Sequence, residues 1–316
     1  MADPAPLWPV FVLPPLLVGA ALVAAGLDAV LHASAARGRT ASPRQLLGRA
    51  MAPPREALRL LVRQPRRTAA ADTALTRVGV VLVPVAAMMA AVVLPLGFTS
   101  VSDLGVGVVW FNAMEALAWA AVWLTGWGPN SVLSLVGGYR FLAQGLAYEL
   151  PHMLAITTAA LGAESLRVGE VVDAQRGLWF AVWMPVAFVV YLASALAMSF
   201  WGPFDQPAGR DLAGGAAAEL SGVDRLVLLG GRWVLLVVTA AFSVPLFLGG
   251  GHGPLLPGWL WTLVKTAAVL GLLVVGRRSL PSLRMDRYLE AAWLVLVPAV
   301  LLQALVVAVV VLRQGA

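Results

Sequence analysis

The chain has 316 residues, of which 60% are hydrophobic and 12% are charged, and it carries a formal net charge of +6. A soluble domain contains about 25% charged residues, so this composition excludes an ordinary soluble globular protein. The apolar runs are continuous rather than alternating, which predicts membrane-spanning helices and argues against a β-barrel. The sequence therefore predicts an all-α, polytopic membrane protein that forms one integral-membrane domain over residues 1–316.

Eight apolar stretches are long enough to cross a bilayer. In chain order they cover residues 7–31, 78–98, 104–125, 141–163, 178–200, 226–249, 259–276 and 291–312. The N-terminal segment lacks a basic region and a small-residue cleavage site, so the first span is expected to be retained. Asp28, near the end of that span, is expected to be a solvated end residue.

The arginines flank these spans unevenly, and their distribution predicts the orientation of the chain. The first loop, residues 32–77, contains ten arginines. The third, fifth and seventh loops contain Arg140, Arg210, Arg225, Arg277, Arg278, Arg284 and Arg287, whereas the opposite side has Arg167, Arg176 and Arg313. Because basic loops stay in the cytoplasm, the odd loops are expected there and both termini outside. The same distribution accounts for the positive charge without a nucleic-acid partner.

Three loops show patterns of their own. Residues 54–63 place an arginine at every fourth position with apolar residues opposite, which predicts a short amphipathic helix at the membrane interface. Residues 164–177 are mixed in charge and predict a short amphipathic helix on the outer side. Residues 201–223 are rich in proline and glycine and carry Asp205, Asp211 and Glu219 among otherwise basic loops. No internal repeat is evident, which argues against an inverted-repeat transporter.

Charged residues inside the predicted spans are the first candidate functional groups. They are Glu115, Glu149, Arg232 and Lys265. Ionisable groups within a membrane are costly and often belong to proton or ion paths, so all four are candidate proton-coupling residues. The alternative is that they are static ion pairs that fix helix packing. Two acids and two bases predict pairing in the bundle interior under either interpretation.

Residues 126–151 combine polar side chains with an apolar run. Arg140, Gln144 and Tyr148 recur every four residues and would share one face of a helix. Pro151 removes one backbone donor close to Glu149. The chain has no cysteine and only three widely separated histidines, so no metal or iron–sulfur site is expected. No nucleophile–base arrangement is evident, and chemistry is expected only together with partner subunits.

At these residues the chain resembles the H-subunit family of NADH–quinone oxidoreductase, respiratory complex I, which includes the related membrane subunit of energy-converting hydrogenases. The likeness covers the chain from about residue 78 onward. It is carried by Gly126-Trp127, Asn130-Ser131, Gly137, Arg140, Gln144 and Tyr148-Glu149, by Pro203-Phe204-Asp205-Gln206-Pro207 with Glu219, by Gly253-Pro254-Leu255-Leu256-Pro257 with Trp261 and Lys265, and by Arg278-Ser279-Leu280-Pro281 with Trp293.

The resemblance implies a non-redox membrane subunit of a proton-translocating NADH:quinone oxidoreductase in a bacterial inner membrane. It implies that the 201–223 loop lies near a chamber for ubiquinone or menaquinone and that Glu149 begins a proton-coupling path. The implied chamber residues are Arg140, Gln144, Tyr148, Phe204 and Asp205. No cofactor is expected on this chain alone. The implied partners are small quinone-site and iron–sulfur hydrophilic subunits, small membrane subunits, antiporter-like subunits and membrane lipid.

The sequence also departs from that family. Trp201 replaces an expected arginine, residues 208–210 lack the expected acids, and the Gly-Pro-Asn-Arg motif after the first span is absent. Glu115 is an acid where a small or apolar residue is expected. Two other functions stay open from the sequence. One is the membrane anchor of an energy-converting hydrogenase or formate hydrogenlyase-type complex, and the other is a stand-alone proton-coupled transporter.

Overall fold

The computed structural model describes residues 8–35, 42–209 and 213–315, and within those ranges it contains helices and no β-strand. This confirms the all-helical class. Arg37, Arg39, Arg210 and Asp211, which contribute to the charge pattern, lie outside the described residues. The longer helices are α1 (Trp8–Ala35), α4 (Thr73–Ala90), α5 (Gly107–Trp127), α6 (Val132–Gly162), α10 (Gly222–Phe247), α11 (Gly258–Ser279) and α13 (Val297–Gly315).

Shorter helices connect or extend these elements. They are α2 (Pro43–Ala50), α3 (Ala52–Val62), η1 (Ala91–Val93), α7 (Val168–Ala174), α8 (Phe180–Trp183), α9 (Pro185–Met198), η2 (Gln206–Ala208), α12 (Met285–Ala291) and η3 (Ala292–Leu296). In the described part of the chain, six helical segments are long and apolar enough to cross a membrane. Each of the eight predicted spans coincides with helix, but α6 and the α8–α9 pair are not among those six.

Two predicted spans have different limits for local reasons. The span predicted over 178–200 is broken at Met184, where α8 ends and α9 begins. Pro185 lacks an N–H and suits the first position of a new helix, so the break falls just before it. The fourth span begins at Val132 rather than at residue 141, because α6 continues through its polar N-terminal residues. Arg140 therefore lies within a helix and not in a loop.

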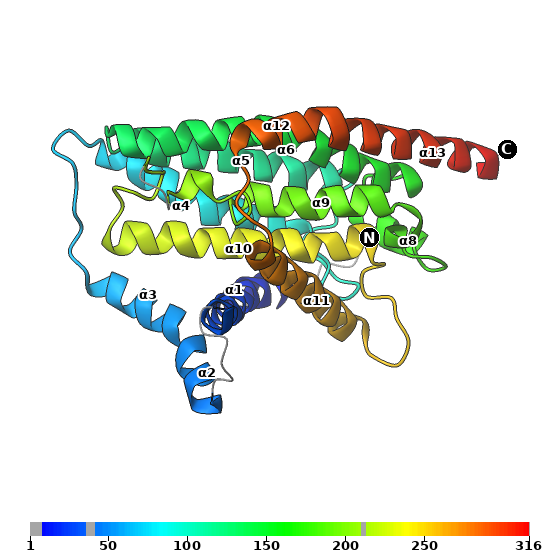
Figure 1. The fold of residues 1–316 in the computed structure, drawn as a ribbon. Helices are drawn as coiled ribbons and strands as arrows, with labels where there is room; N and C mark the ends of the chain where they lie inside the picture. Colours follow the sequence, from blue (N-terminus) through cyan, green and yellow to red (C-terminus); the bar gives the residue numbers. More distant parts are fainter. Residues whose placement is uncertain (1–7, 36–41, 210–212, 316) are drawn as a thin grey trace.

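The long helices are arranged around α10 (Figure 1). Helix α4 lies between α5 and α10, α6 contacts α5 and α9, and α13 runs along α6. On the other side of α10, α11 runs obliquely to the bundle and α1 is seen almost end-on (Figure 1). In the most apolar stretch of α10, 72% of the residues are buried, whereas the figure is 17% in the last span, Met285–Arg313. Helix α10 is thus the centre of the bundle, and α13 lies at its edge.

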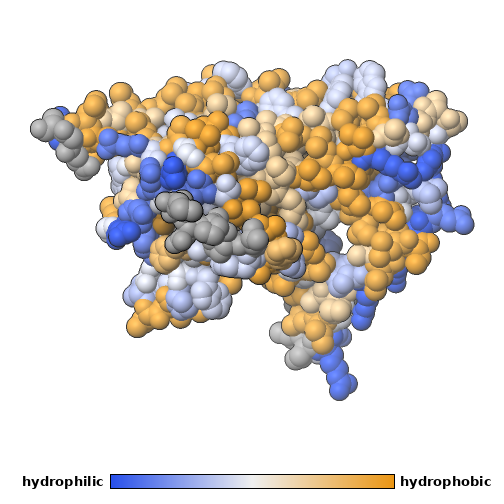
Figure 2. All heavy atoms as spheres, turned by 180° about the vertical axis from the view of Figure 1, so that it is seen from behind, coloured by the Kyte–Doolittle hydropathy of each residue, from blue (hydrophilic) through white to orange (hydrophobic). Residues whose placement is uncertain are grey.

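The surface has the pattern of a membrane-embedded protein. Figure 2 shows hydrophobic residues over most of one face, with hydrophilic residues gathered toward its two sides. Large apolar side chains such as Phe11, Val23, Val189 and Leu302 are exposed. Exposed apolar area on this scale is unfavourable in water and favourable against lipid or partner helices.

The two predicted amphipathic helices are present. Helix α3 exposes Leu58, Leu61 and Val62, buries Leu60 and contacts α1 and α10, and Arg63 follows the helix in an extended conformation. Helix α7 lies within the predicted 164–177 segment and buries Val168, Val171 and Val172. Their placement at the membrane interface remains a prediction.

Candidate functional site

Polar side chains meet along the contact between α5 and α6. The Asn112 amide donates to Glu149 Oε1 at 3.1 Å, and Trp119 Nε1 donates to the Tyr148 hydroxyl at 2.9 Å. Between these contacts, Nε2 of His152 lies 3.0 Å from Oε2 of Glu115. We call Asn112, Glu115, Tyr148, Glu149 and His152 the α5–α6 polar cluster.

The spacing of the residues explains why they meet. Asn112, Glu115 and Trp119 are three and four positions apart, so they share one face of α5. Residues 148, 149 and 152 form the facing surface of α6 in the same way. Gly145 permits the close approach, because a Cβ at that position would lie 2.5 Å from the Trp119 ring. Helix packing thus brings the polar atoms into contact.

The cluster extends from the surface of the chain to its interior. Glu149 and Asn112 are half-buried, whereas Glu115, Tyr148 and His152 are buried. The His152 ring lies 5.1 Å from the ring of Tyr191 on α9, and the Tyr191 hydroxyl donates to the carbonyl of Thr239 on α10 at 2.8 Å. The half-buried end can therefore meet a neighbouring helix, while the other end is enclosed by this chain alone.

A second group of predicted site residues holds the 201–223 loop against α6. Arg140 Nη1 donates to the carbonyls of Gln206 and Gly214, each at 3.2 Å. Gln144 Nε2 donates to the carbonyl of Phe204 at 3.1 Å and to that of Ala197 at 2.6 Å. Arg140 and Gln144 thus bind backbone carbonyls of the segment that contains Phe204 and Asp205, and they position that segment.

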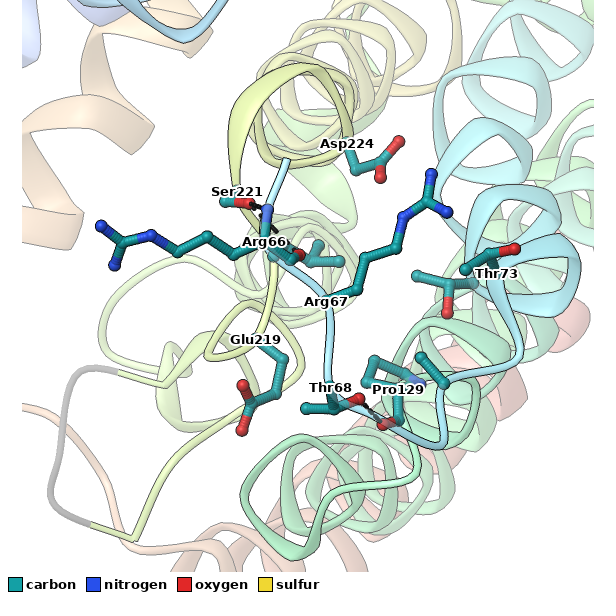
Figure 3. Close-up of a pocket in the computed structure, with 11 residues that line it drawn as sticks. Arg66, Arg67, Thr68, Thr73, Pro129, Glu219, Ser221 and Asp224 are labelled. Atoms are coloured by element: carbon teal, nitrogen blue, oxygen red, sulfur yellow. Dashed lines mark hydrogen bonds between the residues drawn. The ribbon is translucent and has the colours of Figure 1, made fainter. Parts of the chain in front are cut away.

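The same loop is attached on its other side to the end of the basic loop (Figure 3). The backbone N–H of Arg66 donates to the Ser221 hydroxyl at 2.5 Å, and Thr68 donates to the carbonyl of Pro129. The Ser131 hydroxyl also donates to Glu219 at 2.7 Å. Three segments far apart in sequence are therefore joined at this end of the molecule.

A cavity of about 510 Å³ lies beside that loop, between α1, the start of α3 and α10. Its lining combines apolar and basic side chains. The lining includes Ala25, Asp28, His32, Arg49, Pro53, Trp201, Ala208, Arg225, Leu229, Arg232, Trp233 and Arg278. Of the described residues, the predicted chamber residues Arg140, Gln144, Tyr148, Phe204 and Asp205 are not part of this lining.

Trp201 and Asp28 organise the wall of the cavity. The guanidinium groups of Arg232 and Arg277 lie 3.9 Å and 4.1 Å from the Trp201 ring, in cation–π geometry. Asp28 is buried and accepts two hydrogen bonds from Arg278, at 2.6 Å and 2.5 Å. The prediction that Asp28 is a solvated end residue is wrong, because α11 brings Arg278 to it from the far end of the chain.

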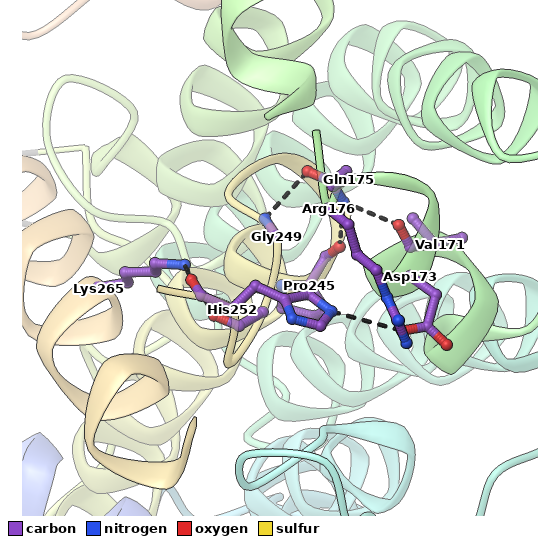
Figure 4. Close-up of polar contacts among 9 residues, drawn as sticks. Val171, Asp173, Gln175, Arg176, Pro245, Gly249, His252 and Lys265 are labelled. Atoms are coloured by element: carbon purple, nitrogen blue, oxygen red, sulfur yellow. Dashed lines mark hydrogen bonds and ion pairs between the residues drawn. The ribbon is translucent and has the colours of Figure 1, made fainter. Parts of the chain in front are cut away.

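Lys265 lies on α11, with its Nζ directed toward the backbone carbonyl of His252 (Figure 4). Its Nζ donates to the carbonyls of Leu248, Gly250 and His252 at 2.6, 2.9 and 2.7 Å. Leu248 is the C-cap residue of α10 and the other two residues follow it, so the three carbonyls lie where the helix ends and a cation is favoured. Glu115 contacts His152 and Lys265 contacts carbonyls, so the predicted pairing of the buried acids with the buried bases is wrong for these two residues.

The structure therefore divides the predicted site residues into four places. Glu115, Tyr148 and Glu149 share the polar cluster, and Arg140, Gln144, Phe204 and Asp205 share the loop contact. Arg232 lies at the cavity, and Lys265 lies at the end of α10. In the described ranges, no group of three or more His, Asp or Glu residues could hold a metal ion.

Sequence reasoning missed His152, Asn112 and Asp28. A signal existed for His152 and Asn112, since each lies three positions from a residue that was predicted, Glu149 and Glu115 respectively. Side chains three apart are neighbours on a helix. Asp28 had no comparable signal in the sequence.

Apolar helices and enclosed ionisable side chains together define a polytopic membrane protein with an internal polar site. The sequence model of a family described as NADH dehydrogenase matches residues 12–308. The chain therefore belongs to the NADH dehydrogenase family, which confirms the resemblance seen in the sequence.

Individual relatives of the chain are named as one particular subunit. The NADH-quinone oxidoreductase H subunit 1 of Geobacter metallireducens is 35% identical over 260 residues, which cover 79% of each chain. The NADH-quinone oxidoreductase H subunit of Geobacillus kaustophilus is 34% identical over 81% of this chain and 78% of its own. The corresponding H subunit 2 of Syntrophobacter fumaroxidans is 38% identical over 68% and 65% of the two chains. These names favour a quinone oxidoreductase subunit over a hydrogenase anchor.

Proposed function

We propose that this chain is the membrane subunit of a bacterial, proton-translocating NADH–quinone oxidoreductase that forms part of the quinone chamber and the start of the proton-coupling path. The chain crosses the inner membrane eight times, with both termini outside. In this topology α6 and the α8–α9 pair are the two additional crossings. Their polar residues are covered by α5, α9 and α10, so the low hydropathy of α6 does not prevent a transmembrane position.

The observation that carries the proposal is that the cavity adjoins an apolar groove. The groove, of about 390 Å³, lies between α1, α3 and α10 and includes Val18, Leu22 and Val234. It shares Ala25, Pro53, Leu229 and Trp233 with the cavity. A cavity with basic side chains in its lining, beside an apolar groove, fits a quinone, whose carbonyl oxygens accept hydrogen bonds and whose prenyl tail is apolar.

In this proposal, Arg140 and Gln144 do not contact the quinone but position the loop that does. Arg140 and Gln144 hold the backbone at Phe204, Gln206 and Gly214, and this backbone leads into Ala208 and Gly209 on the cavity wall. The quinone, either ubiquinone or menaquinone, is a substrate that the chain binds without providing redox groups. Iron–sulfur and small quinone-site subunits are the proposed partners at this end, and small membrane and antiporter-like subunits those along the membrane.

Proton coupling is assigned to the polar cluster. Glu149 is half-buried beside Asn112, at the surface where a neighbouring membrane subunit would cover it. A carboxyl group in this position can exchange a proton between the interior and a partner helix. The contacts of Arg232 with aromatic rings and of Lys265 with carbonyls favour a positioning role for these two bases.

A substitution at the junction of the cavity and the groove tests the proposal. In the purified complex, Ala25→Trp would fill the junction, while Leu27→Trp adds the same side chain at an exposed position of α1 outside both cavities. We expect Ala25→Trp to raise the KM for a long-tailed quinone by about tenfold, with Leu27→Trp near the wild type. Purification without partner subunits, or equal kinetics of the two variants, would contradict the proposal.

A further inference from the structure

The Glu115–His152 pair is the most enclosed group of ionisable side chains in the described part of the molecule. The side chains of His152 and Glu115 are 0% and 2% exposed, and Oε2 lies 3.0 Å from Nε2. Both carboxylate oxygens and both ring nitrogens are buried, and among the described residues none of these four atoms makes a hydrogen bond, so the approach of Oε2 to Nε2 is an ionic contact. Each residue is therefore the other's ion-pair partner, and the described residues provide no second ion pair for either.

This isolation restricts the proton content of the pair. A lone carboxylate or imidazolium in a low-dielectric interior is strongly disfavoured. A carboxyl group and an imidazole that hold one proton between them have no net charge. The proton can bind Oε2, leaving a neutral acid and a neutral ring, or it can move to Nε2 and leave a carboxylate and an imidazolium. The total charge is the same in both arrangements.

The ionisable groups around the pair are two tyrosines with hydrogen-bond partners of their own and one carboxyl group. Tyr191 of α9 contacts the His152 ring, but its hydroxyl donates its hydrogen bond to the Thr239 carbonyl of α10. On α6, Tyr148 accepts a hydrogen bond from Trp119 of α5. The ionisable neighbour on the same helix face is Glu149, three positions before His152, with Cβ atoms about 5–6 Å apart in a helix.

We propose that Glu115 and His152 share one proton and form a second proton-holding site in series with Glu149. This inference rests on the proposed function of the chain as a proton-coupling subunit. A proton that leaves the Glu149 carboxyl binds the pair while the pair releases the proton it already held, so that the pair keeps one proton and no net charge. An imidazole suits this step because it can bind a proton at one ring nitrogen and release one from the other. No electron or covalent bond other than that to the proton changes.

A static ion pair is the competing explanation, and it makes different demands. A static pair needs opposite charges in place, and apolar residues of similar volume often replace it without loss of stability. A proton-holding pair needs groups that bind and release protons. The substitutions below separate these two requirements.

The test uses the complete complex in liposomes and measures protons translocated per NADH oxidised. We expect Glu115→Gln and His152→Gln each to lower this ratio by about tenfold, as loss of an acid–base group would. The exchanged pair, Glu115→His with His152→Glu, is expected to recover most of the ratio. Thr158→Val is the matched control, because Thr158 is a buried α6 residue whose hydroxyl bonds to its own helix.

A double variant tests the inference even if the complexes with single substitutions do not assemble. Glu115→Met with His152→Leu removes both ionisable groups and leaves no unpaired charge. We expect it to assemble and to translocate few protons. Infrared difference spectra on quinone reduction should show a carboxyl band that Glu115→Gln removes.

The outcomes separate the inference from the proposed function. Wild-type ratios in the single variants or in the Met/Leu variant, with translocation lost in Glu149→Gln, would overturn the inference and leave the proposed function in place. Translocation that is also unchanged in Glu149→Gln would count against the proposed function itself.

Discussion

The carboxylate of Asp28 on α1 accepts two hydrogen bonds from Arg278 at the end of α11, across 250 positions of sequence. Arg277 adds a third contact to the same carboxylate, with 3.3 Å between Nη1 and Oδ1. The pair is bidentate, the geometry in which arginine binds a carboxylate most strongly. It attaches α1 to α11 at the rim of the cavity assigned to the quinone.

Asp28→Asn is expected to destabilise the subunit. It removes the charge that two guanidinium groups face, and loss of one partner from a buried ion pair costs about 3 kcal/mol. Asp103→Asn is the matched control, because Asp103 pairs with Arg167 at an exposed site where such pairs contribute at most about 1 kcal/mol. The melting temperature of the purified complex should fall clearly more in Asp28→Asn. Equal shifts in both variants would contradict the structural role of Asp28.

Gly137→Ala is expected to displace the 201–223 loop. A Cβ at Gly137 would lie 1.9 Å from the backbone nitrogen of Ala216, and backbone atoms cannot move aside as a side-chain tip can. Overpacking of this kind costs about 1–3 kcal/mol. Gly276→Ala, on α11, meets no atom within 4 Å and serves as the control. We expect faster proteolysis in the loop and slower quinone reduction for Gly137→Ala alone. Unchanged cleavage would show that the loop can accommodate the methyl group.

Lys265→Met is expected to lower stability without abolishing proton translocation. The substitution leaves three carbonyls at the end of α10 without their donor, which costs about 1–3 kcal/mol for a buried group. Arg176→Met removes an exposed cation from the segment between α7 and α8 and is the control. The measurements are the melting temperature and the number of protons translocated per NADH. Loss of translocation at unchanged stability would show that Lys265 takes part in proton translocation.

Glu149→Gln is expected to separate electron transfer from proton translocation. The amide keeps the shape of the side chain and can still bond to Asn112, but it cannot bind and release a proton. We expect the number of protons translocated per NADH to fall by about tenfold while assembly is retained. Glu164→Gln, at an exposed position between α6 and α7, is the control. A wild-type ratio in Glu149→Gln would assign Glu149 a packing role.

The sequence by itself determined the class of the protein, its family and the positions of most helices. Hydrophobicity along the chain is a local property, so runs such as Gly222–Phe247 are visible without any contact. The amphipathic patterns of α3 and α7 were visible for the same reason. Local rules also explain the break before Pro185, although the apolar run alone obscured it.

The tertiary structure decided which polar groups meet. Glu115 lies beside His152, Asp28 beside Arg278, and Lys265 beside three carbonyls. Arg140 and Gln144 bind loop carbonyls instead of lining the cavity. Charge and spacing cannot predict these partners, because any well-placed acceptor can satisfy a buried donor. Backbone carbonyls occur at every residue, and only the folded arrangement of helices selects among them.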